Sequence, residues 1–411
     1  MGNTLNLVPA TPVDYRRLAE ARLPRFLFDY VDGGANDERT LASNVDDFAR
    51  VLIKQQVLRN VDNLDTSAQI LGSAVSMPLV LAPVGMAGLL GRRGEVQGVR
   101  AANAAGVPFT LSTVSICPLD EVRNAASAPF WFQLYMIRDR GVISELLERA
   151  IANGCDTLVF TVDLPMPGMR HRDVRNGMLN SGLRGKLGKA WQLGTRPGWV
   201  WNVGVKGKPH SFGNLAHVVP DPTDLTAYSE WINRQFDTSV TWKDIEWLRG
   251  IWKGKLLLKG IQEVDDARSA LEVGADGLIV SNHGGRQLDS VASSISKLPA
   301  IAGAVGDQLE ILMDGGVRSG VDVFKALALG ARGVLIGRPW VWALAGAGEQ
   351  GVQNLLATFK RELEIEQLEL EEKWHFASLE KIFIKEEMYI DFKKYANRET
   401  LFQYLHDRLK P

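Results

Sequence analysis

Eight short apolar segments alternate with amphipathic helical segments over most of this chain of 411 residues. Each apolar segment is too short for a lone helix and is continuously apolar, as strands of a parallel sheet covered on both faces are. Eight units of this kind favour a (β/α)8 TIM barrel, with a doubly wound open sheet as the alternative. The segments are PLVLAPVG (78–85), PFTLST (108–113), FWFQLY (130–135), TLVFTVD (157–163), KLLLKG (255–260), GLIVSN (277–282), EILMDGG (310–316) and GVLIGR (333–338).

The rest of the chain divides around this barrel, which we expect at residues 64–360. Residues 1–63 predict helices packed on the barrel, one of which begins near Pro24 and ends at Gly33-Gly34. After the fourth apolar segment the alternation stops, and residues 176–237 are interpreted as an irregular insertion; insertions this long are usually functional. Residues 361–411 form a charged tail that is expected to be helical.

Composition excludes several classes of protein. Lys plus Arg number 47 and Asp plus Glu 48, a net charge of -1, which argues against a nucleic-acid-binding protein. The two cysteines, Cys117 and Cys155, form no C-x-x-C pair, so we expect no metal site and no disulfide framework. No apolar run is long enough to span a membrane, and no secretory signal is evident.

The insertion carries positive charge and tryptophan. Between residues 178 and 217 no acidic residue occurs. Basic side chains interleaved with tryptophans are typical of a segment that lies on an anionic membrane surface. The alternative is a solvated loop that packs on the barrel or on a neighbouring subunit. The basic residues are Arg184, Lys186, Lys189, Arg196, Lys206 and Lys208, and the tryptophans are Trp191, Trp199 and Trp201.

Polar or ionisable residues end nearly every predicted strand, which is where a barrel carries its active site. His283, in SNHGGRQLD, is a candidate general base, and Arg286 can bind a carboxylate through two parallel hydrogen bonds. The glycine-rich turns at 314–320 and 333–339 are candidates for binding phosphate. Lys259 ends a buried strand, so its ammonium group needs an anionic or electron-rich partner.

Several of these segments together resemble the FMN-dependent 2-hydroxy acid oxidase and dehydrogenase family. They are TVDLPMPGMRHRD (161–173), VSNHGGRQLD (280–289), DGGVRSGVDVFKALALGA (314–331) and IGRP (336–339), within a resemblance that runs from about Asp14 to about Lys360. FLFDYVDGGANDE, LAPVGMAGLLGRRGEVQ, LSTVSICPL and WFQLYMIRDRG most resemble the bacterial respiratory L-lactate dehydrogenases of that family.

The resemblance implies FMN as cofactor and a role for each candidate residue. His283 is expected to take the substrate's proton, with Asp163 stabilising the imidazolium. Tyr30, Arg170 and Arg286 are expected to bind the carboxylate, and Tyr135 the substrate oxygen. Lys259 is expected to stabilise the reduced flavin. The remaining residues expected to contact FMN are Ala82, Pro83, Val84, Gly85, Ser112, Gln133, Thr161, Ser281, Asp314, Gly315, Gly316, Arg318, Gly337 and Arg338.

The expected reaction is oxidation of L-lactate to pyruvate, with electrons passed to a membrane quinone or another respiratory acceptor. The resemblance also implies a homotetramer, placed at the cytoplasmic side of a bacterial inner membrane, or alternatively in the cytoplasm. Competing readings are a soluble 2-hydroxy acid oxidase that reduces oxygen, a mandelate dehydrogenase, and a catalytically silent FMN- or phosphate-binding barrel. Two departures stand out: Val114, often aromatic in glycolate-oxidising relatives, and a C-terminal tail without the family's Met-x-Leu-x-Gly segment.

Overall fold

The structure is a computed structural model that describes residues 8–53, 64–176, 182–219, 231, 234–370 and 383–384. Its centre is a parallel eight-stranded sheet with the order β4-β11-β10-β9-β8-β7-β6-β5. A parallel bridge between Leu81 and Phe109 brings β4 beside β5, so the sheet is nearly closed into a ring. The strands are β4 (Leu79–Leu81), β5 (Thr110–Ser112), β6 (Trp131–Leu134), β7 (Thr157–Thr161), β8 (Lys255–Ile261), β9 (Gly277–Val280), β10 (Glu310–Asp314) and β11 (Gly333–Ile336).

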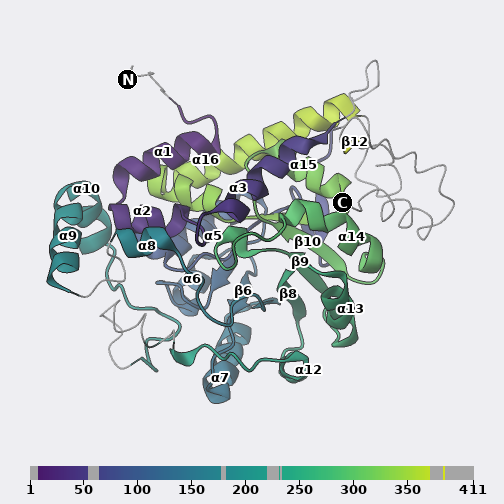
Figure 1. The fold of residues 1–411 in the computed structure, drawn as a ribbon, viewed down its shortest axis with the longest axis horizontal. Coiled ribbons are helices and arrows are strands. Elements are labelled where there is room, and N and C mark those ends of the chain that lie inside the picture. Colours follow the sequence, from purple (N-terminus) through teal and green to yellow (C-terminus); the bar gives the residue numbers. More distant parts are fainter. Residues whose placement is uncertain are drawn as a thin grey trace.

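Helices follow these strands and surround the ring, which confirms the predicted TIM barrel (Figure 1). Each of the eight predicted segments coincides with one strand, and β8 extends one residue past its segment. The surrounding helices are α4 (Ala87–Leu90), α5 (Gly94–Ala105), α6 (Leu119–Ala125), α7 (Arg140–Ala152), α12 (Trp242–Ile251), α13 (Val264–Glu272), α14 (Ser294–Val305), α15 (Gly320–Ala328) and α16 (Arg338–Leu370).

Large apolar side chains fill the ring from alternate strand positions. Val80, Val159 and Ile279 belong to this inner cluster, and each is fully buried. The short hairpin of β2 (Ala68–Ile70) and β3 (Ser73–Val75) adds Ile70, and the backbone N–H of Leu71 donates to the Glu310 carboxylate over 2.6 Å. Glu310 begins β10, so the hairpin closes the N-terminal end of the barrel. The opposite end, where the strands finish, is left for a site.

Three N-terminal helices lie across the barrel beside α16 (Figure 1). They are α1 (Pro12–Arg22), α2 (Arg25–Asp32) and α3 (Arg39–Asp46), followed by the 3-10 turn η1 (Asp47–Arg50). The helix expected between Pro24 and Gly33 is α2, with Pro24 before its first residue and Gly33 as its C-cap. Tyr15 of α1 and Leu27 and Phe28 of α2 are buried in the hydrophobic core, and both helices contact α16.

The described part of the insertion is helical, so our expectation of an irregular segment was wrong there. The helix α8 (His171–Arg175) lies just before the insertion. Within the insertion lie α9 (Leu183–Gly194), α10 (Pro197–Trp199) and the π turn η2 (Val200–Val205). Gly185, Gly188 and Gly194 lie within α9 and weaken its helical pattern, because glycine is a poor helix former. Figure 1 shows α9 and α10 at the left edge of the molecule, beside α1 and α2.

At the C-terminus, α16 continues to Leu370, past the position where the tail is predicted to begin. Of the tail beyond it the structure describes only β12 (Phe383–Ile384), which pairs antiparallel with β1 (Val51–Leu52); the other tail residues lie outside the described ranges. Within those ranges no helix combines the length and the apolar character that crossing a bilayer requires.

Candidate active site

A cavity of about 560 Å³ opens at the carboxyl ends of the strands. Its volume lies within the range of ligand sites, about 300–1,000 Å³. The sequence-predicted residues that line it are Tyr30, Ala82, Pro83, Val84, Gly85, Tyr135, Thr161, Arg170, Lys259, His283, Arg286, Asp314, Gly315, Gly316, Arg318, Gly337 and Arg338. The other four, Ser112, Gln133, Asp163 and Ser281, lie directly behind this lining and hydrogen-bond to residues in it or to one another.

His283 and Asp163 form one pair in this site. Nδ1 of His283 lies 2.9 Å from Oδ1 of Asp163, and the backbone N–H of His283 donates to Ser281 Oγ over 3.0 Å. His283 has a φ of 58°, a left-handed backbone conformation that a non-glycine residue adopts only when its surroundings hold it there. The backbone thus aims the imidazole at Asp163 and into the cavity.

The Asp163 carboxyl group stays ionised in this environment. Burial raises its pKa, but the charge and hydrogen bond of His283, together with the charge of Lys259, lower the pKa below its ordinary value. Gly260, with a φ of 113°, makes room for it, since a Cβ at that position would lie 2.6 Å from Asp163 Cβ. A buried carboxylate beside an imidazole is suited to stabilise the charged form of that imidazole.

Two arginines gather around Tyr30. The guanidinium carbons of Arg286 and Arg170 lie 5.0 and 5.7 Å from the centre of its ring. Burial lowers the pKa of Arg286, and the neighbouring charge of Arg170 lowers it further. Two guanidinium groups this close in a buried cavity would be stabilised by an anion between them, and a carboxylate suits their geometry.

Tyr135 lies beside the imidazole of His283 in this site. Its ring stacks on His283 with the ring centres 6.5 Å apart and the planes inclined by 14°. Burial raises the pKa of Tyr135, and the charge of Asp163 raises it further, so the phenol keeps its proton. A protonated hydroxyl beside the imidazole can donate to an oxygen of a bound ligand.

Lys259 is buried and paired. Its Nζ lies 2.8 Å from Asp314 Oδ2 and 2.8 Å from Ser281 Oγ. The sequence required an anionic or electron-rich partner for this ammonium group, and Asp314 is one. A flavin is therefore not the only group that neutralises Lys259, although the side chain lines the cavity and is available to one.

The ends of β10 and β11 form a basic cradle. Gly315 and Gly316 have φ values of 96° and 88°, which open their backbone N–H groups to a ligand as only glycine readily does. Arg318 stacks on Trp342 with 5.0 Å between guanidinium carbon and ring centre, and burial lowers the pKa of Arg318 to about 10. Burial also lowers the pKa of Arg338, and the charges of Arg286 and Arg318 add to this effect.

This cradle fits the phosphate of FMN. Buried guanidinium groups whose pKa is depressed have no sufficient counter-charge nearby, and a phosphate would supply it. Arg338 begins α16, where backbone N–H groups also favour an anion. On the other side of the cavity, Ser112 donates to Gln133 over 3.1 Å and Gln133 donates to Thr161 over 3.0 Å, a chain of amide and hydroxyl groups suited to a heteroaromatic ring.

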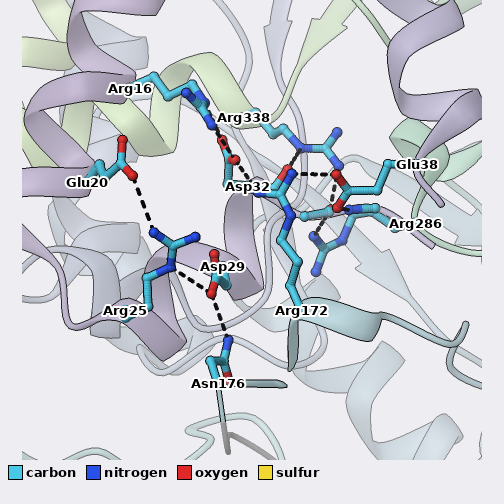
Figure 2. Close-up of polar contacts among 12 residues, drawn as sticks. Arg16, Glu20, Arg25, Asp29, Asp32, Glu38, Arg172, Asn176, Arg286 and Arg338 are labelled. Atoms are coloured by element: carbon cyan, nitrogen blue, oxygen red, sulfur yellow. Dashed lines mark hydrogen bonds and ion pairs between the residues drawn. The ribbon is translucent and has the colours of Figure 1, made fainter. Parts of the chain in front are cut away.

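The C-terminal end of α2 holds both sides of the site together (Figure 2). The Gly33 carbonyl accepts from Arg286 Nη1 over 3.0 Å and from Arg338 Nη2 over 2.9 Å. Arg338 also donates to the carbonyls of Asp32 and Gly284 over 3.2 and 2.8 Å. The Gly33 carbonyl therefore contacts both Arg286 and Arg338. Arg286 belongs to the group with Tyr30 and Arg170 that is suited to bind a substrate carboxylate, here called the carboxylate cluster, and Arg338 belongs to the basic cradle.

Sequence reasoning missed a network of ion pairs that fixes α8 beside α2 (Figure 2). Arg16 binds Asp32 through two hydrogen bonds of 2.6 and 2.7 Å, and Arg172 reaches the same carboxylate over 2.8 Å. Arg172 also pairs with Glu38, which accepts from the Gly34 N–H over 2.9 Å. The two pairs of Arg172 join residues more than a hundred positions apart, and no local pattern reveals them.

Asp173 is a second residue that the sequence left unassigned. Its carboxylate is buried and lies 2.7 Å from Nε of Arg170, three residues earlier. The spacing within PMPGMRHRD could have indicated this pair, because residues three apart lie on one face of a helix. Asp173 orients Arg170 within the carboxylate cluster.

Comparison with known proteins agrees with this chemistry. A model of the FMN-dependent dehydrogenase family matches residues 19–369. The L-lactate dehydrogenase of Alcaligenes faecalis is 51% identical over 359 residues, which cover 87% of this chain and 94% of that protein. The L-lactate dehydrogenase of Xanthomonas axonopodis pv. citri is 54% identical over 352 residues, covering 86% and 90%.

Solved structures of the same kind are similar in fold. A monotopic membrane protein, (S)-mandelate dehydrogenase, superposes with a TM-score of 0.83 and 34% identity over 88% of this chain and 95% of its own. A mandelate oxidase superposes with a TM-score of 0.77 and 35% identity over 92% and 98%. With the fold, the site and these relatives in agreement, the chain belongs to the FMN-dependent dehydrogenase family, whose members oxidise 2-hydroxy acids.

Proposed function

We propose that the protein oxidises L-lactate to pyruvate with His283 as the general base and passes the electrons to a respiratory quinone at a membrane. One observation carries the catalytic part of this proposal. His283 lines the same cavity as Tyr30 and Arg286, and Asp163 lies directly behind His283 and pairs with it. Base and carboxylate cluster are thus placed to act on one small hydroxy acid.

The proton moves to Nε2 of His283. Asp163 is ionised at its lowered pKa and can only accept a hydrogen bond, so the Nδ1 that faces it carries the hydrogen. Nε2 is then the basic nitrogen of the ring. When it takes the substrate's proton the imidazole becomes positively charged, and Asp163 at 2.9 Å stabilises that charge.

The substrate is held by its two ends. Arg286 and Tyr30 bind the carboxylate, with Arg170 as the second cation. Tyr135, which keeps its proton, donates to the oxygen on the α-carbon, where negative charge develops during oxidation. These contacts orient the α-carbon toward the cofactor and its hydroxyl toward His283.

FMN supplies the two-electron acceptor for the α-carbon. The backbone of 82–85 and the side chains of Ser112, Gln133 and Thr161 would border its ring system, with Lys259 and Ser281 nearby. The Lys259 ammonium group would lie beside the ring and would stabilise negative charge gained there on reduction. The ribityl phosphate would lie in the basic cradle, formed by Asp314, Gly315, Gly316, Arg318, Gly337 and Arg338.

L-lactate is favoured over mandelate by the relatives at about half identity, which carry the name L-lactate dehydrogenase. Mandelate is the second candidate, because (S)-mandelate dehydrogenase superposes well at 34% identity. Val114, Phe212 and Phe236 are among the apolar residues of the cavity wall and would contact the substituent on the α-carbon. The two acids differ there by a methyl and a phenyl group.

A quinone acceptor is supported by the described part of the insertion. Leu187, Trp191 and Trp201 expose 62%, 76% and 60% of their surface. Lys206 Nζ lies 5.2 Å from the Trp201 ring centre, so a cation accompanies an exposed aromatic ring. Such residues favour the interface of an anionic membrane, where quinones are dissolved. We propose that this face lies on the cytoplasmic side of a bacterial inner membrane. We also propose that the protein is a homotetramer, and light scattering of the protein in detergent would measure its oligomeric state.

The first experiment is an anaerobic absorbance spectrum of the FMN-loaded protein before and after each acid is added. We expect flavin bands that bleach with L-lactate and persist with D-lactate. Rapid bleaching with (S)-mandelate and none with L-lactate would show that mandelate, and not L-lactate, is the substrate. Admitting air should reoxidise the flavin slowly, whereas a water-soluble quinone should reoxidise it quickly; fast reoxidation by air would identify an oxidase.

The variant His283→Ala tests the base. We expect it to bind FMN and to lose most of its rate of flavin reduction by L-lactate. If the variant reduces its flavin at the wild-type rate, His283 is not the base. If the flavin of the wild-type protein does not bleach with any 2-hydroxy acid, the protein is a catalytically silent barrel.

A further inference from the structure

A second cavity, of about 450 Å³, lies outside the active site. Its walls come from four elements that are distant in sequence: the C-terminal end of α1, the turn between α4 and α5, the segment 195–203 of the insertion, and α16. Figure 1 shows α10, which belongs to the insertion segment, close to α1 at one edge of the molecule. The insertion is thus not only a surface feature but one wall of a cavity.

Three arginines line this cavity, and no aspartate or glutamate does. Arg196 is fixed, because its Nε donates to the Leu23 carbonyl over 3.1 Å and its Nη1 to the Thr195 carbonyl over 3.2 Å. Arg22 and Arg92 are exposed, and neither forms an ion pair with a carboxylate in the described part of the chain. Three like charges around one cavity favour an anion within it.

Beside the polar side chains of Gln97, Thr195 and Asn202, much of the remaining lining is apolar. Leu90 and Leu344 are buried at 2% and 1% exposure and form its inner wall with Ala345. Trp199 lines the cavity as well, and its Nε1–H donates to the Leu89 carbonyl over 2.9 Å, which fixes the ring against α4. A ligand for this cavity therefore combines an anionic group with apolar surface.

The segment that lines the cavity also carries an exposed apolar side chain. Trp201 follows Trp199 by two residues and is 60% exposed. On α16, Val341 lines the active-site cavity and Leu344 lines this one, about one helical turn away. A ligand in the second cavity would therefore lie close to both the exposed face of the insertion and the flavin site.

From these observations we infer that the second cavity binds the phosphate group of an anionic amphiphile, as in a phospholipid headgroup. Guanidinium groups recognise phosphate through paired hydrogen bonds, and basic pockets near a membrane surface bind lipid headgroups. Arg22, Arg92 and Arg196 would contact the phosphate, while Leu90, Trp199 and Leu344 contact the glycerol and the first methylene groups. This inference rests on the membrane association in the proposed function and adds a specific site to it.

The test uses the FMN-loaded full chain and vesicles of two compositions with equal negative charge. One contains phosphatidylglycerol, and the other contains oleate, which is anionic without phosphate. We expect the wild type to prefer phosphatidylglycerol, and Arg22→Gln/Arg92→Gln to lose at least about tenfold in affinity for it while binding oleate vesicles nearly as before. A variant that keeps the wild-type preference would overturn the inference.

Two controls make the result specific. Arg50→Gln/Arg268→Gln removes the same charge from two other exposed arginines and should keep the preference. Arg22→Lys/Arg92→Lys keeps the positive charges but lacks the planar guanidinium groups, and should keep only part of the preference for phosphatidylglycerol. FMN content and the thermal unfolding temperature of each variant report whether the fold is kept.

The source of the phosphate is tested with sn-glycerol 3-phosphate in solution, followed by calorimetry. Binding that depends on Arg22 and Arg92 without vesicles assigns the site to a soluble phosphate ester, whereas dependence seen only with phosphatidylglycerol assigns it to a lipid. No dependence in either arm overturns the site. If the wild type binds no vesicle, membrane association itself fails, and L-lactate oxidation is judged separately by flavin bleaching.

Discussion

Arg172 donates from Nη1 to Oδ2 of Asp32 across 2.8 Å, and this ion pair ties α8 to α2. The Asp32 side chain is 4% exposed, and Arg16 donates to both of its carboxylate oxygens (Figure 2). Arg170 stands directly before α8, so the position of α8 sets where Arg170 meets Tyr30. Arg172 thus acts on the substrate cluster through another residue and is a positioning residue.

We expect Arg172→Gln to raise the KM for L-lactate about tenfold with little change in kcat. The variant holds Arg170 less firmly and so binds the substrate carboxylate more weakly, by the same amount in the ground state and the transition state. The base and the cofactor site are unchanged. Asp32 keeps its pair with Arg16, so the fold should survive. Steady-state kinetics with a soluble quinone measures the two constants.

The matched control is Arg361→Gln, which removes an arginine that is 67% exposed and whose ion pair in the described part of the chain is a local one with Glu364. It should leave both constants unchanged. Arg172→Lys should restore part of the affinity, since it keeps the charge. An Arg172→Gln enzyme whose kcat falls while its KM stays at the wild-type value would show that Arg172 has a different role.

Asp163→Asn tests the orientation of His283. The amide keeps the shape of the side chain but cannot stabilise an imidazolium, so we expect the rate of flavin reduction to fall by about 10²–10⁴-fold. Stopped-flow absorbance at saturating L-lactate measures this rate. Asp276→Asn is the control, because that carboxylate pairs with Arg249 and Lys255 at the opposite end of the barrel. A wild-type rate in Asp163→Asn would remove Asp163 from the mechanism.

All eight strands could be predicted from the sequence because a parallel strand buried on both faces is continuously apolar and is bounded by polar or glycine residues. The strand Leu79–Leu81 lies within PLVLAPVG, for example, and Asp314 ends β10 within EILMDGG. Barrel geometry then places every strand end at one face, so candidates such as His283 and Lys259 could be assigned to one site before their contacts were known.

What the sequence could not predict depends on distant partners. The Arg172–Asp32 pair spans 140 residues, and the Gly33 carbonyl that joins Arg286 to Arg338 is a backbone atom with no sequence signature. The α9 helix is a different case. Leu183, Leu187 and Trp191 recur every four residues, but the intervening glycines lower helix propensity, so this spacing alone does not predict a helix.

Acid stability depends in part on Asp32. Burial raises its pKa, but the hydrogen bond and charge of Arg16, with the charge of Arg172, bring the pKa below the ordinary value of about 3.9. A carboxyl group whose pKa is lower in the folded state contributes stability above its unfolded pKa, and loses it as the pH falls toward the folded value.

We therefore expect Asp32→Asn to unfold at a lower temperature than the wild type at pH 7, and the difference to shrink between about pH 5 and pH 3. Thermal unfolding followed by circular dichroism at each pH measures this. Asp265→Asn, at a carboxylate that is 95% exposed, should run parallel to the wild type. A difference between wild type and Asp32→Asn that is constant over the pH range would contradict the assignment.

Lys259 and Asp314 form a buried ion pair, with side chains 5% and 11% exposed and a separation of 2.8 Å. Removing one partner leaves the other charge buried without compensation, so we expect Lys259→Met to lower the free energy of unfolding by about 3–5 kcal/mol. Adding Asp314→Asn removes the stranded charge and should recover a large part of this loss. Urea unfolding of FMN-free protein isolates the pair from the cofactor. Lys297→Gln breaks an exposed pair with Glu263 and should cost only about 0–1 kcal/mol. If the double variant is as unstable as the sum of its single variants, the two charges are not coupled, and Lys259 is held by Ser281 instead.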